Sequence, residues 1–503
     1  MEQFTALVND IDSLVWSMPL VFLCLGVGLF LSIRLGFPQL RLFGDMIRLL
    51  AKGDKSAELI ASRSGKPKGI SGFQAFATTV GARVGMGNIA GIASAIYFGG
   101  PGAIFWMWII AIIGAASAFT EATLGQAYKE KDKNGVFVGG PAYYLKKGLK
   151  CKPYAIVFAI CAILGPGLLL PGVQINSLVI VFEEAFNVDR VIVGAVCCAI
   201  LAFVVFGSIK RIARLAELVA PVMCLIYIVL AVIILGLHFS EIPAAFSMII
   251  SSAIGANALF GAIIGSAISW GVKRGIYSNE AGMGCGAIVS AAAECSHPAK
   301  QGLIQACSIY ADTLLVGTAT ALIVILTGMY DVVDANGAFL VSQTGGIEAG
   351  IKWTQFALTS TYGDWCGQLL AIIIVLFVFT SLTGYCYQAE SNVNYLTNGS
   401  KKAITVARVV FILASFAGAV ISADAMWAMG DIGYGLLGWA NIIAIVLLSG
   451  KAAAILKDYE IQKKHGYDPV FNPEKFDIKD ETGAWDEYKE FLNDPLLGDA
   501  VRK

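Results

Sequence analysis

Charged residues are scarce in this chain of 503 residues, because Asp, Glu, Lys and Arg together make up 14% of it. A typical soluble domain has about 25%. The 36 basic and 36 acidic side chains cancel, so the totals give no excess of positive charge for binding nucleic acid. Hydrophobic residues make up 57%, and the mean hydropathy is +0.72. These totals exclude an ordinary soluble domain and indicate an all-α polytopic protein in a lipid bilayer.

Ligands for a metal ion are also sparse. The eleven cysteines form no C-x-x-C pair, and the three histidines, His238, His297 and His465, are far apart in the chain. Zinc sites need closely spaced ligands, so the sequence predicts neither a zinc site nor a prosthetic cofactor. No base–nucleophile constellation accompanies Asp312, and we therefore expect a protein that is not an enzyme. The sequence implies no obligate protein partner.

The first membrane helix is predicted close to the N-terminus. Residues 1–12 are acidic, whereas a cleavable signal begins with basic residues, and the uncharged run 13–33 is long enough to cross a bilayer. Similar runs recur at 71–97, 103–127, 153–182, 191–209, 215–239, 252–272, 301–329, 366–389, 403–423 and 432–450. Together they predict eleven transmembrane spans in a domain that covers 1–457.

Lysine and arginine are concentrated in every second connection between these runs. The basic clusters lie after the first run, at 129–152, at 210–214, at Lys273, Arg274 and Lys300, and at Lys401 and Lys402. Because positive loops stay in the cytoplasm, the N-terminus is predicted outside and the C-terminus in the cytoplasm of a bacterial-type inner membrane. Residues 458–503 are expected to form a cytoplasmic tail that packs loosely on the membrane domain.

Glycines interrupt the apolar stretch 78–108, with Gly81, Gly85, Gly87 and Gly91 within a few turns of one another. Each internal glycine costs a helix about 1 kcal/mol relative to alanine. Broken backbone at membrane depth is tolerated where it is buried in protein or lines a cavity. A second glycine-rich run, 260–275, falls in span six of ten once the first helix is set aside. The pair predicts a five-plus-five inverted repeat with broken first and sixth core helices.

Several motifs resemble those of the alanine/glycine:cation symporter family, also called sodium:alanine symporters. They are VGMGNIAGIASAI with GGPGAIFWMW (84–108), Glu121, GGPAYYL (139–145), GVKRGIYSNEAGMG (271–284), Asp312 with Thr313, and FTSLTGYCYQAESNVNYL (379–396). The resemblance covers nearly the whole chain. It implies the five-plus-five amino-acid transporter fold with one extra N-terminal helix, and sodium-coupled uptake of a small neutral amino acid. The chain departs from the family at Tyr385, where a Trp is usual, and at GPGLLLPGVQ, where a Gly-Asn pair is usual.

A zwitterionic substrate needs donors for its carboxylate and acceptors for its ammonium group. The predicted substrate-binding residues are Thr79, Gly85, Gly87, Asn88, Gln174, Phe260, Ile264 and Tyr385. Backbone N–H groups at the start of the second half-helix are predicted to bind the carboxylate. Carbonyls near Phe260 are predicted to bind the ammonium group, with Ile264 in the apolar wall. Asn88 is equally suited to capping the half-helix, and Phe260 with Ile264 to ordinary core packing.

The resemblance also implies a sodium site. By analogy with related transporters, it is built from the carbonyls of Gly81 and Val84 and the hydroxyls of Thr380 and Ser381. Such hydroxyls also bond commonly to their own helix.

Intramembrane charges indicate function by default. Arg83 is interpreted either as a gate paired with an acidic residue or as a side chain snorkelling to the helix end. Its candidate partners are Glu121, Glu280, Asp312 and Glu390.

The sequence therefore predicts a symporter that imports alanine or glycine with Na⁺ across the inner membrane. Two alternatives stay open: a transporter of the same fold with another small amino acid or with proton coupling, and, more distantly, an ion channel.

Overall fold

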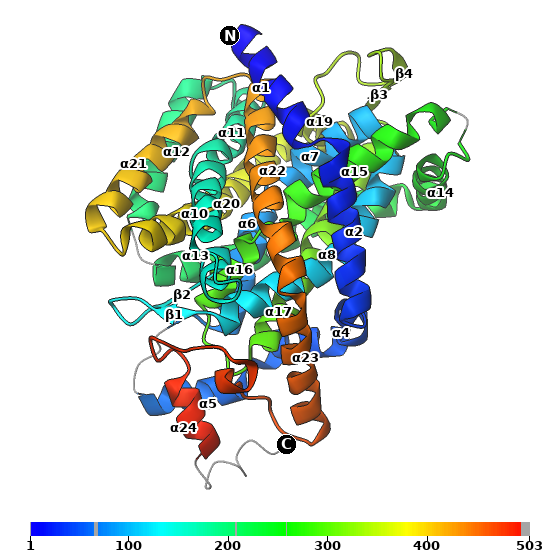
Figure 1. Ribbon diagram of the computed structural model, residues 1–503. Helices are drawn as coiled ribbons and strands as arrows, with labels where there is room; N and C mark the ends of the chain where they lie inside the picture. The colour runs from blue at the N-terminus through cyan, green and yellow to red at the C-terminus, as the bar shows by residue number, and fades with distance from the viewer. Residues whose placement is uncertain (1, 65–68, 207–208, 258, 494–503) are drawn as a thin grey trace.

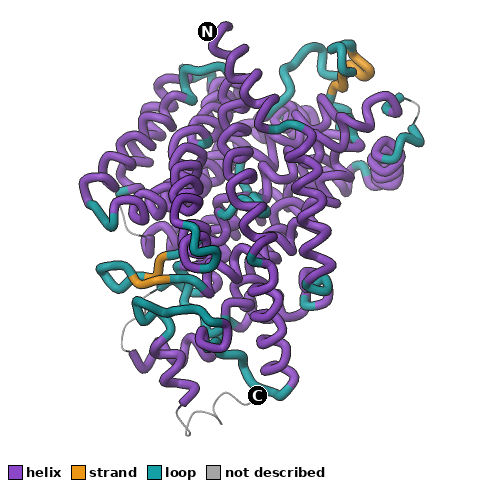
Figure 2. Tube along the Cα trace, in the orientation of Figure 1, coloured by secondary structure: helices purple, strands orange, loops and turns teal. Residues whose placement is uncertain are grey.

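The computed structural model describes residues 2–64, 69–206, 209–257 and 259–493. Within these ranges the chain is almost entirely helical, with two antiparallel hairpins, β1 (Glu130–Lys131) with β2 (Phe137–Val138) and β3 (Asp331–Val333) with β4 (Phe339–Ser342), as Figure 2 shows. The all-α prediction is confirmed for the described chain.

The first half of the chain holds α1 (Glu2–Val15), α2 (Met18–Arg34), α3 (Pro38–Arg41), α4 (Phe43–Lys52), α5 (Lys55–Ser64), α6 (Gly72–Arg83), α7 (Met86–Gly99), α8 (Gly102–Ala127), α9 (Pro141–Lys147), α10 (Lys152–Leu164), α11 (Pro171–Phe186), α12 (Arg190–Val205), α13 (Ile209–Leu237) and α14 (Ile242–Ala253). The second half holds α15 (Ile264–Asn279), α16 (Cys285–Ala291), α17 (Pro298–Ile309), α18 (Thr318–Leu326), α19 (Ile351–Tyr362), α20 (Asp364–Thr397), α21 (Lys401–Ala417), α22 (Ala423–Leu447), α23 (Ser449–Lys464) and α24 (Asp486–Asn493). Wider π-helical turns join α10 to α11 and α17 to α18.

Six continuous helical segments of the described chain are long and apolar enough to cross a membrane, and α1 with α2, bent by 41°, makes a seventh if counted as one span. This agrees with a polytopic membrane protein. Helices α1 and α24 lie at opposite ends of the molecule (Figure 1). The predicted total of eleven spans and the inverted repeat stay predictions, because the interrupted and shorter helices fall outside that length criterion.

The first predicted interruption is confirmed. Helix α6 ends at Arg83, Val84 and Gly85 leave helical geometry with ψ values of 86° and −144°, and α7 begins at Met86. The interruption separates two nearly apolar helices that are too short to cross a bilayer singly, and both are buried within the protein. The freed peptide groups therefore lie where they contact protein or solute.

The second interruption was predicted in the wrong place. Helix α15 is continuous through Gly271 and Gly275, and the chain breaks instead between Glu280 and Gly284, before α16. Gly282 and Gly284 take positive φ values of 83° and 86° there, which only glycine adopts without cost. Gly271 and Gly275 serve close packing, since a Cβ at either would stand 2.5 Å or less from α8.

The C-terminal segment also differs from prediction. Val470, Phe471, Trp485 and Tyr488 are all buried, so the segment packs closely on the rest of the chain rather than loosely. The Phe471 N–H donates to the Ser296 carbonyl at 2.8 Å.

A buried lysine lies among the aromatic rings of this segment. The Lys129 ammonium lies 4.2 Å from the ring centroid of Phe137 and 4.1 Å from that of Trp485. Burial lowers the pKa of Lys129 to about 8. These cation–π contacts hold the C-terminal segment against the end of α8 and the β1–β2 hairpin.

Replacing Trp485 with alanine should release this segment. Truncating a buried tryptophan costs about 3–5 kcal/mol, and here the loss falls on the docking of residues 468–491. We expect added protease to cleave the segment at least about ten times faster, while the helical membrane region stays intact. Leu492→Ala, at an exposed position of the same segment, is the control and should leave the cleavage rate unchanged. An unchanged rate in Trp485→Ala would mean that the aromatic contacts do not hold the segment.

Candidate functional site

The interruption at Gly85 meets two other helices at close range. A Cβ at this position would stand 2.5 Å from Ser381 Oγ on α20 and 3.1 Å from Gln174 Oε1 on α11. The Met86 N–H, the first of α7, donates to Gln174 Oε1 at 3.4 Å. Only glycine therefore fits here, and the start of α7 faces polar side chains from α11 and α20.

A chain of hydrogen bonds runs from this point to the second interruption. Gln174 Nε2 donates to the Tyr385 hydroxyl at 3.4 Å, and the Tyr434 hydroxyl lies 3.0 Å from that of Tyr385. Tyr434 donates in turn to Glu280 Oε1 at 2.7 Å. All four side chains are buried. The structure thus links Gln174 and Tyr385, both predicted from the sequence to bind substrate, to Tyr434, which was not predicted to have a role.

The oxygens predicted to bind sodium come together in part. Ser381 Oγ donates to the Gly81 carbonyl at 3.1 Å, across the gap between α20 and α6. Val84, at the break itself, has left helical geometry, so its carbonyl turns out of the α6 hydrogen-bond ladder. The Thr380 hydroxyl bonds to the Leu376 and Phe377 carbonyls of its own helix. Of the two hydroxyls, Ser381 is the one directed at the interruption.

The remaining residues near the break hold several roles. Thr79 Oγ1 and Asn88 Oδ1 are buried and find no hydrogen-bond partner within the described part of the chain. Asn88 Nδ2 donates to the Asp312 carbonyl at 2.9 Å, so the side chain ties α7 to the π-helical turn between α17 and α18 rather than capping its own helix. Gly87 faces α15, where a Cβ would stand 3.1 Å from Ser278 Cα. Gly87 therefore serves helix packing at this point.

Phe260 and Ile264 are not brought to the break. Phe260 lies against Gly100, beyond the far end of α7, and Ile264 begins α15 against Gly255. The fourteen residues of α7 separate Gly100 from Gly85 by about 21 Å along the helix axis. The carbonyls near Phe260, predicted to bind the ammonium group, lie with it at that far end, in the 3₁₀ turn Gly261–Ile263 that precedes α15.

Three buried carboxyl groups surround Arg83. The Arg83 Nε atom lies 3.9 Å from Glu280 Oε2, which accepts no hydrogen bond within the described chain. Glu121 Oε2 accepts the Gly284 N–H at 2.8 Å, and Asp312 Oδ2 accepts the Ser278 hydroxyl at 2.7 Å. Arg83 is buried rather than snorkelling, and among its predicted partners Glu280 is the one that it meets in an ion pair.

Glu390, the fourth candidate partner, is instead paired with Arg408. Across the described residues, no group of three or more His, Cys, Asp or Glu side chains is arranged to hold a metal ion.

Comparison with known proteins supplies the family. The model of the sodium:alanine symporter family matches residues 1–473. The chain belongs to the sodium:alanine symporter family. The resemblance seen in the motifs is thereby confirmed, and it extends through the two interrupted helices to the docked C-terminal segment.

Three relatives show how this family member compares with others. YrbD of Bacillus subtilis (strain 168), provisionally named a sodium/proton-dependent alanine carrier, is 47% identical over 474 residues, covering 94% of this chain and 96% of its own. The sodium/proton-dependent alanine carrier of Bacillus sp. (strain PS3) is 43% identical over 458 residues, covering 88% and 99%. GlnT of Bacillus subtilis (strain 168), provisionally named a sodium/glutamine symporter, is 43% identical over 471 residues, covering 94% and 93%. The relatives are thus ion-coupled amino-acid carriers by name.

A buried ion-pair cluster lies between α1, α15 and α22 of this family member. Arg274 on α15 donates to both oxygens of Asp431 on α22, at 2.8 and 2.9 Å. Lys273 pairs with Asp431 at 2.8 Å and with Asp12 of α1 at 2.7 Å. The Cζ atom of the Arg274 guanidinium lies 4.9 Å from the ring centroid of Trp427. These contacts join α15 to α22 and to α1.

This cluster corrects the assignment of two basic residues. Lys273 and Arg274 were counted with a cytoplasmic connection, yet they lie inside α15 and meet α1, at the end opposite the C-terminus (Figure 1). The misplaced break explains the error, because it ended a span at residue 272. Asp431 was missed since it follows MWAMG in an apolar run, where a single acid gives no sign of its distant partner.

Proposed function

We propose that the chain is a symporter that imports alanine or glycine with Na⁺ across a bacterial-type inner membrane, with its N-terminus outside and its C-terminus in the cytoplasm. The observation that carries the proposal is the interruption at Val84–Gly85. There, the start of α7, the non-helical backbone of Val84 and two polar side chains converge inside the protein. Family membership adds that relatives are named as amino-acid carriers.

The substrate is assigned to the start of α7. The N-terminal end of this half-helix carries partial positive charge, and its first N–H group, that of Met86, makes only a long hydrogen bond to Gln174 Oε1 at 3.4 Å; such an end suits a carboxylate. Gly85 and Asn88 frame that end, and Gln174, Thr79 and Tyr385 supply nearby polar groups. A Cβ at position 85 would displace Ser381, so glycine here lets α11 and α20 approach the start of α7 closely.

The ammonium group is assigned to the side of the site that faces Glu280 and Tyr434. Phe260 and Ile264 drop out of the proposed substrate site because they lie at the other end of α7. Gly87 keeps an indirect role, because its contact with Ser278 lets α7 approach α15.

The sodium ion is assigned to the oxygens of Gly81, Val84, Thr380 and Ser381. Entry of one positive charge gains about 2.3 kcal/mol per 100 mV of membrane potential. The ion and the amino acid would order the same broken helix, so each raises the affinity for the other. That shared element is the proposed basis of coupling.

Ser381→Ala should weaken activation by sodium. The change removes one oxygen ligand and leaves the Gly81 carbonyl without its donor. A contact of this kind is worth about 1.5 kcal/mol, so the Na⁺ concentration for half-maximal uptake should rise about tenfold. Thr383→Ala, whose hydroxyl bonds to the Thr380 carbonyl of its own helix, is the matched control and should leave the Na⁺ curve in place. Equal curves for the two variants would remove Ser381 from the ion site.

Uptake by the purified protein in liposomes tests the function. Labelled alanine and glycine should accumulate when Na⁺ is outside, and a negative interior should raise the rate. Replacing Na⁺ with K⁺ or choline should abolish accumulation. Current that does not saturate with alanine would favour a channel instead.

A second candidate is coupling to protons, or transport of a larger amino acid such as glutamine. Glu121, Glu280 and Asp312 are buried carboxyl groups close to both interruptions, and intramembrane carboxyl groups commonly relay protons. Relatives are named as sodium/proton-dependent and as a glutamine symporter. Accumulation driven by a pH gradient without Na⁺, or competition by glutamine, would favour this candidate.

A further inference from the structure

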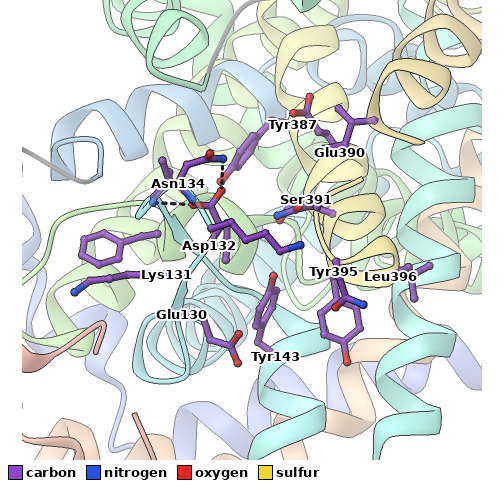
Figure 3. Close-up of a pocket in the computed structure, with 18 of the residues that line it drawn as sticks. Glu130, Lys131, Asp132, Asn134, Tyr143, Tyr387, Glu390, Ser391, Tyr395 and Leu396 are labelled. Carbon is purple, nitrogen blue, oxygen red and sulfur yellow. Dashed lines mark hydrogen bonds between the residues drawn. The ribbon is translucent and has the colours of Figure 1, made fainter. Parts of the chain in front are cut away.

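A pocket of about 880 Å³ opens beside the β1–β2 hairpin, away from the interrupted helices. Its walls are that hairpin, the start of α10, the last turns of α20 and the start of α21. Figure 3 shows the aromatic rings of Tyr143, Tyr387 and Tyr395 around it. Nothing in the proposed transport cycle uses this space.

The acidic side chains in the wall are already satisfied. Glu130 pairs with Lys147 at 2.7 Å, and Glu390 pairs with Arg408 at 2.7 Å. Asp132 accepts the N–H groups of residues 134 and 136 at 2.8 and 2.9 Å within its own turn (Figure 3). Asp132 is thus the one carboxylate of the wall without a basic partner among the described residues, so at most one negative charge is left to offset further positive charge.

Four lysines in the same wall have no such partner. Lys133, Lys146, Lys152 and Lys401 line the pocket, and their ammonium groups make no ion pair or hydrogen bond with any residue that the structure describes. Lys133 reaches across from the hairpin, with its Cδ 4.0 Å from the Cβ position of Gly399. The pocket thus gathers positive charge from three separate segments of the chain.

Two of these lysines lie at the N-terminal ends of helices, where a positive charge is unfavourable. Lys152 and Lys401 are the first residues of α10 and α21, and the positive end of each helix repels a cation. An anion between them would relieve both repulsions and accept their charge-assisted hydrogen bonds.

The pocket also borders the lipid. Ile156 lies in its wall, and further along α10 Val157 and Ile160 expose 51% and 45% of their surface. In a membrane protein such exposed apolar residues face acyl chains. The lysines therefore lie at the level of phospholipid headgroups, where basic pockets between helices bind anionic lipids.

We propose that this pocket binds a phosphate group, carried by an anionic phospholipid such as phosphatidylglycerol or by a small soluble phosphate ester. The lysines would contact the phosphate oxygens, and Ile156 and Ile404 would contact the adjoining carbon chain. The proposal is independent of the transported solute.

The test uses the full-length protein, purified in neutral detergent and stripped of lipid. The shift in thermal unfolding midpoint is measured, at constant ionic strength, with four probes: dihexanoyl-phosphatidylglycerol, dihexanoyl-phosphatidylcholine, glycerol 3-phosphate and inorganic phosphate. A ligand that binds only the folded state raises the midpoint. We expect phosphatidylglycerol to raise it by several degrees and phosphatidylcholine to have little effect. A shift with glycerol 3-phosphate as well would identify the phosphate ester alone as sufficient.

The variants separate this site from general attraction to a basic surface. A triple replacement of Lys146, Lys152 and Lys401 with glutamine should lose most of the shift, and the same triple with arginine should keep it. The control triple replaces Lys457, Lys464 and Lys479 with glutamine; these are exposed lysines outside the pocket. Its shift in the unfolding midpoint should equal that of the unaltered protein.

If the triple variant does not fold, the single variants Lys152→Gln and Lys401→Gln replace it in the test. Each is expected to lose about half of the shift in the unfolding midpoint. Equal shifts in the pocket and control variants, or equal shifts with the two lipids, would overturn the proposal.

Discussion

Gly85→Ala is expected to reduce amino-acid uptake by up to about 100-fold. The new Cβ would stand 2.5 Å from Ser381 Oγ and 3.1 Å from Gln174 Oε1. Forcing such an atom into a packed interior costs about 1–3 kcal/mol, and 3 kcal/mol corresponds to a factor of roughly 100. The cost falls on the side chains that would hold the ion and the start of α7, so binding should suffer more than folding.

Gly91→Ala is the matched control, two turns further along α7. There the nearest atom to a Cβ is Arg274 Cδ at 3.6 Å, an ordinary contact, and alanine favours a helix by about 1 kcal/mol over glycine. Uptake by Gly91→Ala should stay within about twofold of the unaltered protein at equal expression. If Gly85→Ala transports as well as Gly91→Ala, the tight junction at the break has no role in transport.

Asp431→Ala is expected to destabilise the protein by about 3–5 kcal/mol. Asp431 and Arg274 expose only 2% and 3% of their side chains, and removing one partner leaves a buried charge uncompensated. Lys273 keeps Asp12 at 2.7 Å, so the loss centres on Arg274. The measurement is thermal unfolding of the purified protein, with uptake recorded in parallel.

Two further variants interpret that result. Replacing both partners, with Arg274→Met and Asp431→Leu, should recover most of the stability, because a buried ion pair and an apolar pair of similar volume differ little. Uptake should stay impaired in the double variant if the ion pair between α15 and α22 takes part in the transport cycle, because that pair can no longer form. Glu183→Ala is the control, because it breaks an exposed ion pair with Arg190. It should lower the free energy of unfolding by no more than about 1 kcal/mol. Full transport by the double variant would show that the ion pair is not part of gating.

The sequence predicts the first interruption correctly because its cause is local. Glycines at 81, 85, 87 and 91 within one apolar run weaken a helix wherever they occur, and the chain breaks among them. The second run contains glycines for another reason. Gly271 and Gly275 allow α8 to pack closely against α15. This packing depends on α8, so the sequence of residues 260–275 alone does not indicate it. The true break at 280–284 depends on two glycines with positive φ and on a carboxylate, Glu121, that accepts the Gly284 N–H from α8.

The candidate site, like the two interruptions, can be predicted from the sequence only in part. Gly85, Gln174, Ser381 and Tyr385 meet as the motifs suggested, but the link through Tyr434 to Glu280 joins positions 154 residues apart. Such a contact follows from the packing of α22 against its neighbours, and no periodicity or local spacing encodes it. The same holds for Arg274 and Asp431.

Binding of alanine to the purified protein, measured by calorimetry in NaCl and again in choline chloride, tests the central claim most directly. The account predicts saturable binding in Na⁺, none detectable in choline, and loss of binding in Gly85→Ala but not in Gly91→Ala. Alanine binding of equal affinity in both salts, or in both glycine variants, would contradict it.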